Sequence, residues 1–408
     1  MPYLRTGGAC SPMKQIRNSY RHTIYASYIG YITQAIINGF VPLLFLTFQS
    51  EFGLSLDRIG LLVTVNFSTQ LIVDLLAAKY IDRIGYRKAI VAAHLFCAAG
   101  LCLLAILPSL LSSPFLGLCL SVITYAIGGG LIEVLISPIV EACPTNDKSA
   151  AMSLLHSFYC WGCVAVILLS TLLFYFVGTQ YWKPIACLWA IVPLANSLYF
   201  TQVPIHTLDT GGEPLTLSAL LRSKGFLLLV LFMVCAGASE QAMSQWASAF
   251  AESGLQVSKT LGDLTGPCFF AALMGISRII HAKYGEKVSL ERYLFASALL
   301  CVISYLITCL SPIPLLSLLG CGICGFSVGA MWPGVFSLAA KRCPHGGTGM
   351  FALLALAGDC GCGAGPSIVG FVSDAWNNNL KLGLLIGMAF PLLMLLGLWK
   401  LAARKTIE

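Results

Sequence analysis

Five charged side chains lie inside long stretches of the sequence that are otherwise apolar: Asp74, Glu133, Glu240, Arg278 and Asp359. If those stretches cross a membrane, each isolated charge costs at least about 2.5–3.5 kcal/mol, so such residues usually face a cavity or an opposite charge. A carboxyl group at a buried cavity can load and release a proton, or it can bind a polar solute. Glu133, Glu240 and Asp359 are therefore candidate proton-coupling residues.

Each of these residues also has a structural interpretation, which the sequence leaves open. Glu133 can pair with Arg278, and Glu240 can serve as a polar contact between helices. Asp74 can line a cavity, take part in a gate or hold two helices together. Arg278 can extend to the membrane surface, pair with an acid or form part of a gate.

Polar and aromatic residues accompany these charges at helical spacing. Asn66 and Gln70 precede Asp74 at intervals of four residues, and similar spacings place polar residues on one face of other apolar stretches. Amides bind hydroxyl groups in pairs, and an indole ring can cover the C–H face of a sugar. The candidate solute-binding residues are Tyr31, Gln34, Asn38, Tyr159, Gln241, Gln245, Trp246 and Trp332.

The stretches that carry these residues have the length and composition of membrane helices. The 408-residue chain is 58% hydrophobic and 10% charged, with a mean hydropathy of +0.84, which leaves too little polar surface for a water-soluble protein. Each run holds about 20 residues, as a helix needs to cross a bilayer, and the short alternating segments of a membrane β-barrel are not seen. We predict an all-α membrane protein with twelve spans, at 24–48, 59–78, 89–107, 115–140, 150–178, 182–201, 225–250, 264–282, 292–310, 314–340, 348–373 and 382–402.

The positions of Lys and Arg predict the orientation of these spans. Segments on the side of the N-terminus hold 19 of the 24 Lys and Arg residues, whereas segments on the other side hold four. By the positive-inside rule, we expect both termini in the cytoplasm and a multi-pass protein of the cell (inner) membrane. The same bias explains the net charge of +7, so no nucleic-acid partner is expected.

One hydrophilic segment interrupts the spans for longer than the others. Residues 202–224 separate six predicted spans from six. We therefore expect an N-terminal bundle at 1–201, a cytoplasmic linker at 202–224 and a C-terminal bundle at 225–408.

The charged segment at 77–88 resembles that of a known family. Its run Asp82-Arg83-x-Gly85-x-Arg87-Lys88 resembles the signature loop of the major facilitator superfamily, Gly-x-x-x-Asp-Arg/Lys-x-Gly-Arg-Arg/Lys. The sequence departs from that pattern at Ala78, where the family has its first glycine, and at Tyr86. The resemblance implies two pseudo-symmetric six-helix bundles that rock about a central binding site. It also implies that Asp82, Arg83 and Arg87 belong to a gate on the cytoplasmic side. Asp74, two turns before Asp82, and Arg278, in the second half's counterpart of this segment, are further candidate gating residues.

A finer resemblance lies at 128–144, "GGGLIEVLISPIVEACP". The glycines, Glu133 and the Ser137-Pro138 pair are similar to the fucose–proton symporter group, where the corresponding glutamate takes part in proton coupling. Ser137 stands where that group has Asn, and Asn38 stands where it has an acid in the first helix. One of its two proton sites is therefore missing, and its coupling scheme does not transfer as a whole.

These resemblances lead to a functional prediction and its alternatives. We expect a proton-coupled secondary transporter of a small polar solute, a monosaccharide by resemblance, that works by alternating access as a monomer in the lipid bilayer. The alternative is a proton-coupled exporter of drugs or metabolites, which would have a cavity lined mainly by aromatic residues and Met. A third hypothesis, a transporter-like nutrient sensor, calls for a large signalling extension.

No enzyme, catalytic residue, cofactor or metal site is predicted. No nucleotide-binding motif is present, so we do not expect ATP to drive transport. The Ala-Gly-Asp triplet at 357–359 resembles only part of the motif of intramembrane aspartyl proteases, and its partner helix is missing. Two Cys-x-x-Cys pairs, at 160–163 and 321–324, lie inside predicted spans and are interpreted as packing residues.

Overall fold

The structure is a computed structural model that describes residues 19–144, 148–205, 217–284, 289–343 and 347–405. Within these ranges, the side chains of residues 78, 79, 82, 148–153, 217–219, 282–284, 347–349, 351–352 and 402–405 are not described.

In the described part of the chain, twelve helical segments are long and apolar enough to cross a membrane, which confirms the predicted all-α membrane fold. The first half comprises α2 (Tyr20–Gly39), η1 (Val41–Leu44), α3 (Phe45–Phe52), α4 (Leu56–Ile84), α5 (Tyr86–Leu110), α6 (Pro114–Glu141), α7 (Lys148–Val177), η2 (Thr179–Tyr181) and α8 (Trp182–Gln202). The second half comprises α9 (Leu217–Arg222), α10 (Lys224–Ala249), η3 (Phe250–Gly254), α11 (Lys259–Asp263), η4 (Leu264–Cys268), α12 (Phe269–Tyr284), α13 (Leu290–Leu310), α14 (Pro314–Val328), α15 (Met331–Arg342), α16 (Gly347–Ala375), α17 (Leu380–Gly387) and α18 (Ala389–Lys405).

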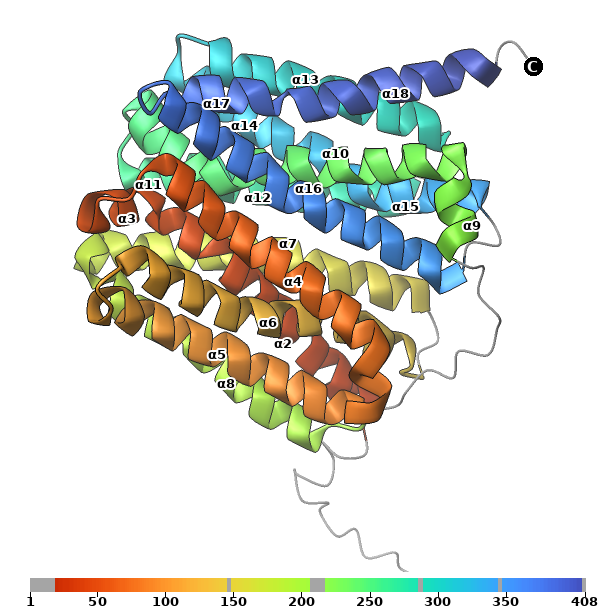
Figure 1. Ribbon diagram of the computed structural model, residues 1–408, viewed down its shortest axis with the longest axis horizontal. Helices are drawn as coiled ribbons and strands as arrows, with labels where there is room; N and C mark the ends of the chain where they lie inside the picture. The colour runs from red at the N-terminus through yellow and green to blue at the C-terminus, as the bar shows by residue number, and fades with distance from the viewer. Residues whose placement is uncertain (1–18, 145–147, 206–216, 285–288, 344–346, 406–408) are drawn as a thin grey trace, which may run out of the picture.

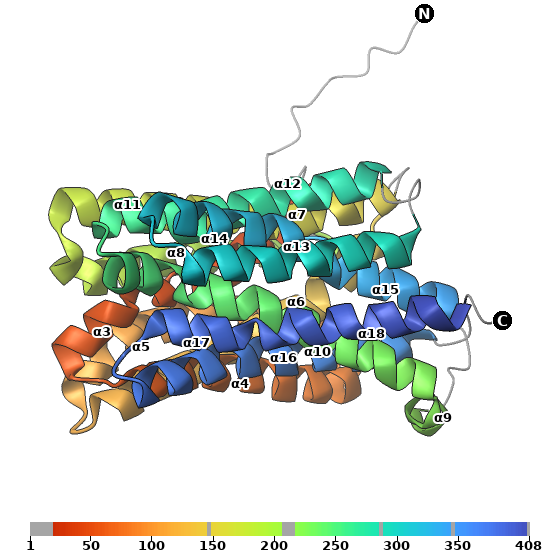
Figure 2. The same ribbon diagram turned by 90° about the horizontal axis from the view of Figure 1, so that it is seen from above.

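The helices form two bundles of six spans, which Figures 1 and 2 show with their long axes roughly aligned. Because twelve crossings return the chain to its starting side, the start of α2 and the end of α18 lie at the same end, called the basal end here. The apical end carries the turns at residues 53–55, 111–113, 255–258 and 376–379. The two halves contact each other mainly through α4 with α16 and through α7 with α12.

Several spans are interrupted along their length, in contrast to the continuous runs that the sequence predicts. The first span breaks between Gly39 and Val41, and the tenth breaks between Val328 and Met331. The seventh and eighth contain π-helical turns, η3 and η4. Interrupted helices leave backbone groups without their helical partners, and in transporters such breaks commonly lie at binding sites.

Glycine residues explain the tight turn between α4 and α5 and the close contact between α10 and α16. Gly85 alone separates α4 from α5, with φ of +88° and ψ of 134°, a backbone conformation that other residues rarely adopt. Along α10 and α16 the backbones approach so closely that a Cβ atom on Gly237 would lie 2.2 Å from the carbonyl oxygen of Gly358. This contact fixes the position of Asp359, the next residue on α16.

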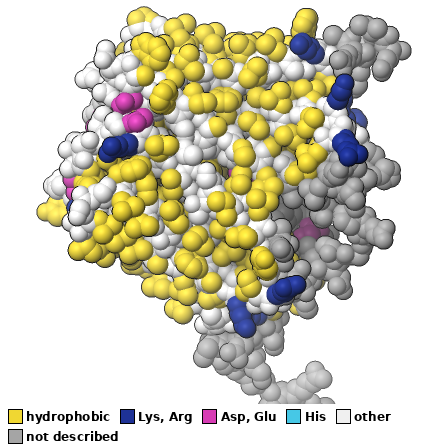
Figure 3. Space-filling view, viewed as in Figure 1, with side chains coloured by type: hydrophobic (Ala, Val, Ile, Leu, Met, Phe, Trp, Pro, Cys, Tyr) yellow, Lys and Arg dark blue, Asp and Glu magenta, His cyan; other side chains and the backbone are white. Residues whose placement is uncertain are grey.

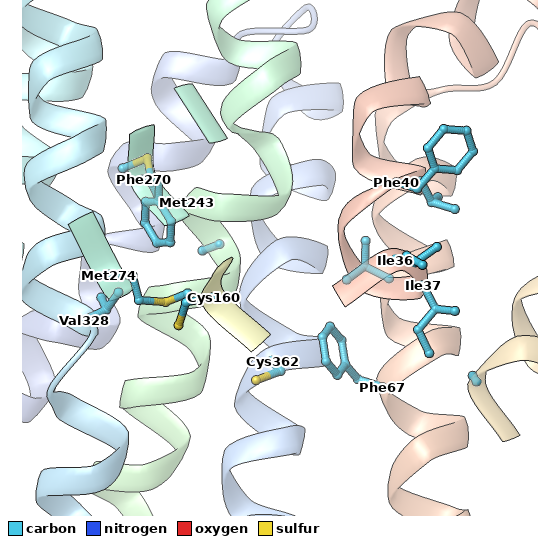
Figure 4. Packing of buried hydrophobic residues seen from close by; sticks show 14 of the residues in the cluster. Ile36, Ile37, Phe40, Phe67, Cys160, Met243, Phe270, Met274, Val328 and Cys362 are labelled. Atoms are coloured by element: carbon cyan, nitrogen blue, oxygen red, sulfur yellow. The ribbon is translucent and has the colours of Figure 1, made fainter. Parts of the chain in front are cut away.

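The remaining surface and core suit a lipid solvent. Figure 3 shows hydrophobic side chains over the middle of one face, with Lys and Arg at its edges and mainly toward the basal end. Inside, Figure 4 shows Phe67 and Cys362 in the packed region, and Phe67 of α4 also lies against Gly363 of α16. The contact between the halves is therefore tightly packed at this depth.

Candidate functional site

A ladder of side-chain amides lies between α2 and α4, at the centre of the first half. The Gln34 amide donates to Gln70 Oε1 at 3.0 Å. Asn66 Nδ2 donates to Asn38 Oδ1 at 3.0 Å, and Gln70 Nε2 donates to Asn66 Oδ1 at 3.0 Å. Helical spacing puts these residues on the facing sides of two helices, as the sequence predicts for each helix separately.

The ladder continues into the second half because the first span is broken. The carbonyl of Asn38 would normally accept from the residue four positions later, but that residue is Pro42, which has no N–H. Gln245 of α10 fills the vacancy by donating to the Asn38 backbone carbonyl at 3.2 Å. Gln245 also donates to Gln241 Oε1 at 2.9 Å. The amides of both halves thus form one hydrogen-bonded chain.

A cavity of about 40 Å³ opens beside this chain. Its polar lining consists of Asn38, Tyr159, Glu240, Gln241, Ser244 and Gln245, and its apolar lining includes Pro42, Ile167, Phe270 and Met274. The volume accommodates a few water molecules and is far below the roughly 300 Å³ or more of a typical ligand pocket. The site is therefore contracted in this conformation, with residues from both halves around it.

Glu240 and Arg278 form a buried ion pair at the edge of the cavity. Arg278 Nη2 lies 3.7 Å from Glu240 Oε2, and the two side chains are 19% and 9% exposed. The Arg278 guanidinium also acts electrostatically on His156 and Cys160 of α7, in the opposite half. Of the interpretations that the sequence left for Arg278, the structure shows pairing with an acid, and the acid is Glu240 instead of Glu133.

Glu133, Asp74 and Asp359 form a second acidic group, which we call the carboxyl cluster. Among the described residues, no Lys, Arg or His nitrogen lies within 4.0 Å of these three carboxyl groups. Glu133 accepts a hydrogen bond from Gln34 Nε2 at 3.4 Å, which joins the cluster to the amide ladder. Asp74 Oδ1 and Asp359 Oδ2 are buried without a hydrogen-bond partner.

Two polar clamps hold the halves together at the apical end. In the first, Asp374 of α16 accepts from the backbone N–H of Leu56 at the start of α4, at 3.3 Å. An acid at a helix N-terminus is stabilised by the free N–H groups and by the helix dipole. About two turns deeper, Thr64 hydrogen-bonds Ser367.

The second clamp is centred on the fully buried Asp263. Lys259 pairs with Asp263 at 3.2 Å and donates to the Leu43 carbonyl of the first half at 2.6 Å. Thr171 of α7 donates to Asp263 Oδ2 at 3.2 Å. Sequence reasoning missed both clamps. The only signal was the i, i+4 spacing of Lys259 and Asp263, which fell outside the span predicted to start at 264.

The sequence profile described as Major Facilitator Superfamily matches residues 26–366. The chain belongs to the major facilitator superfamily. Members of this superfamily are transporters that bind small-molecule substrates. Among curated proteins, none matches the sequence significantly.

Solved structures share this major facilitator fold at low sequence identity. A bacterial homolog of the human lysosomal transporter Spinster, in an inward-facing and occupied conformation, has a TM-score of 0.75 at 14% identity, over 94% of this chain and 97% of that chain. The E. coli fucose:proton symporter FucP has a TM-score of 0.66 at 16% identity, over 93% and 98%. The nucleoside transporter NupG has a TM-score of 0.75 at 11% identity, over 93% and 99%.

The residues of the superfamily's signature loop are only partly placed. The side chain of Asp82 lies outside the described residues, and Arg83 is exposed at the end of α4. Arg87 donates to the carbonyls of Phe200 and Thr201 at 2.8 and 3.0 Å. A cation at the carbonyl end of α8 is favourable for the helix dipole, so Arg87 here ties two helices of the same half together.

The predicted aromatic residues take different positions. Tyr159 lines the cavity, and the Tyr31 hydroxyl lies 3.1 Å from the Ser137 hydroxyl. The structure does not bring Trp246 to the cavity: its ring is fully buried against Phe45, and its indole N–H donates to the Pro366 carbonyl at 2.9 Å. Trp332 lies away from the cavity too, with its ring packed against Gly358.

Proposed function

We propose that this major facilitator protein couples the movement of a small polar solute, with a monosaccharide as the leading candidate, to the movement of protons by alternating access. The observation that carries the proposal is the amide chain across the two halves. Asn38 of the first half and Gln245 of the second line the same cavity and share a hydrogen bond. A solute that replaces this bond would contact both halves at once, as alternating access requires.

The chemistry of the cavity suits a solute with several hydroxyl groups. Three amides, one carboxylate and two hydroxyls provide adjacent donors and acceptors, which hydroxyl pairs can satisfy simultaneously. Two of the structural neighbours are named as carriers of fucose and of nucleosides, both hydroxylated solutes. Tyr159 and Phe270 remain as rings that can cover the apolar face of such a solute.

Proton coupling is supported by the different surroundings of Glu240, which is buried, and Glu133, which is partly buried. Glu240 has a cation beside it, whereas Glu133 has only the Gln34 amide. A buried carboxylate without a cation is unstable, so Glu133 is the better proton carrier, and Glu240 is the better solute ligand. Because Gln34 bonds both Glu133 and the amide ladder, protonation of Glu133 can change the arrangement of the solute site.

The test is uptake of labelled monosaccharides into proteoliposomes under an inward proton gradient. The wild-type protein should accumulate one of the sugars, and Glu133→Gln should abolish accumulation. Glu291→Gln, which changes an acid in a surface pair with Arg342, is the matched control and should keep wild-type uptake. Accumulation that persists in Glu133→Gln would remove Glu133 from the coupling mechanism.

The exporter alternative is kept because the apolar side of the cavity includes Phe270 and Met274. If no sugar is accumulated while cells expressing the protein expel a lipophilic cation, the import proposal fails and export replaces it. We also propose that the protein lies in the cell membrane with both termini in the cytoplasm, and that 202–224 is the linker between the two bundles. Protease protection of a C-terminal tag tests the location of the C-terminus.

A further inference from the structure

Asp74 and Asp359 face each other across the boundary between the two halves. Asp74 lies on α4 and Asp359 on α16, the pair of helices that makes the most extensive contact between the halves. The two helices run antiparallel: Thr64 hydrogen-bonds Ser367, and Phe67 lies against Gly363. Two turns further along α4, the same register brings Asp74 opposite Asp359, and the two carboxyl groups interact electrostatically. Asp359 is only 4% exposed. Asp74 is covered on its other side by α6, which packs closely because Gly130 has no side chain: a Cβ there would lie 3.1 Å from Asp74 Oδ1.

Neither carboxyl group has the partners that an ionised acid needs. Asp74 Oδ1 and Asp359 Oδ2 are both buried without a hydrogen-bond donor. The titratable groups that face them are Glu133 from α6 and Cys360 from α16 itself, and each would add negative charge if ionised. Within the described part of the chain, no basic nitrogen lies within 4.0 Å of either acid.

Two carboxylates that face each other in a membrane interior cannot both be charged, because water does not screen the repulsion between them. A single proton removes the difficulty: one acid becomes a hydroxyl donor and the other becomes its acceptor. The resulting bond uses one of the oxygens that otherwise have no donor, and it is charge-assisted and therefore strong. Such a pair titrates as one unit, with properties that belong to neither acid alone.

We infer that Asp74 and Asp359 hold one shared proton between the two halves of the molecule, and that this proton locks α4 to α16. When the proton is present, the pair is a bond between the halves. When it leaves, the same pair becomes a repulsive contact that favours separation of α4 from α16. The shared proton adds a state-dependent proton site to the proposed transport function; its role in coupling rests on that function, but its existence does not.

The first experiment counts protonated carboxyl groups by infrared spectroscopy of the purified full-length protein at neutral pH, without any solute. Asp74→Asn and Asp359→Asn should each lose the same carboxylic C=O band, with an intensity of one group. The double variant should lose no more than either single variant, because all three remove the same proton. Asp57→Asn, on the same helix but at the apical end, should leave the spectrum unchanged.

Two outcomes would overturn the shared proton. One is a wild-type spectrum whose carboxylic band is unaffected by either substitution. The other is loss of two separate bands whose intensities add in the double variant, which would mean two independently protonated acids.

A second measurement, the thermal unfolding midpoint as a function of pH, is made first on the wild-type protein and so does not depend on a variant that folds correctly. The thermal unfolding midpoint of the wild type should fall as pH rises through the range in which the infrared band disappears, since the folded state binds a proton that the unfolded chain has released. Asp74→Asn, whose amide can donate permanently to Asp359, should lose this dependence. A wild-type midpoint that does not change while the band disappears would show that the proton does not hold the halves together. Failure of sugar transport in the wild type would leave both measurements unaffected.

Discussion

The side-chain amide of Gln245 occupies the position that the missing N–H of Pro42 leaves open on the Asn38 carbonyl, at 3.2 Å. Pro42, which breaks the first helix, thereby leaves a backbone carbonyl free to bind a side chain from the opposite half of the molecule. The contact joins the two halves beside the contracted cavity, and it uses groups that a hydroxylated solute can replace. The site and the conformational change are consequently built from the same hydrogen bonds.

Gln245→Leu should weaken solute binding and raise the KM for uptake. The substitution removes the Gln245 amide from the solute's partners, and a hydrogen bond left unmade at a buried site costs about 1–3 kcal/mol, roughly a 5- to 150-fold change in an equilibrium constant. Initial uptake rates over a range of solute concentrations measure the effect. Gln180→Leu, at an exposed residue outside the cavity, is the control, and an equal KM in the two variants would contradict the assignment.

Arg278→Met should destabilise the protein, because it leaves Glu240 buried without its cation. Removing one partner of a buried pair costs about 3–5 kcal/mol. Thermal unfolding of the detergent-solubilised protein should show a lower midpoint, and the double variant Glu240→Gln/Arg278→Met should recover much of the loss. If the double variant is as unstable as the two single losses added together, the residues do not act as a pair.

Glu133→Gln should separate exchange from accumulation. The variant cannot release a proton, so accumulation driven by a gradient should stop, whereas exchange of labelled for unlabelled solute across the membrane should continue. Wild-type accumulation should increase with the size of the inward proton gradient and vanish without it. Loss of both accumulation and exchange in Glu133→Gln would indicate a role in binding or folding instead of coupling.

Asp263→Asn should loosen the apical end. Asp263 bonds Lys259 of its own half and Thr171 of the other, and the loss of its charge weakens both contacts. Hydrogen–deuterium exchange should become faster in peptides that cover Val41–Leu44 and Lys259–Asp263, with little change at the basal end. Glu252→Gln serves as the comparison and should have a smaller effect, since Glu252 lies 4.0 Å from Lys259 and is only partly buried. Equal exchange in the two variants would exclude Asp263 as the centre of the clamp.

Gly85→Ala should lower stability by about 1–3 kcal/mol, because the turn between α4 and α5 needs a backbone conformation that is costly for any residue with a side chain. Gly225→Ala serves as the control: it lies in the first turn of α10, where a Cβ would meet only the Ser223 hydroxyl oxygen at 3.8 Å. The unfolding midpoints of the two variants check the prediction. An unchanged midpoint for Gly85→Ala would mean that the turn can adopt another conformation.

Residue spacing predicted which side chains share a face. Gln34 and Asn38 do line one side of α2, and Asn66 and Gln70 do line one side of α4, because the period of a helix depends only on the backbone. Spacing says nothing about rotation of one helix against another. Spacing therefore could not predict that Arg278 pairs with Glu240 instead of Glu133. It also could not predict that the Trp246 indole donates to the Pro366 carbonyl, 120 residues away, instead of lining the cavity.

The sequence by itself determined that this chain is a twelve-span membrane protein of the major facilitator superfamily, since hydropathy and a local motif suffice for both. It also identified the buried acids, because a charge in an apolar run is visible without knowing its neighbours. Only the tertiary structure decided which acids have a cation, which face each other across the halves, and which amides meet at the cavity. Those outcomes depend on contacts between helices far apart in the chain, and packing alone sets them.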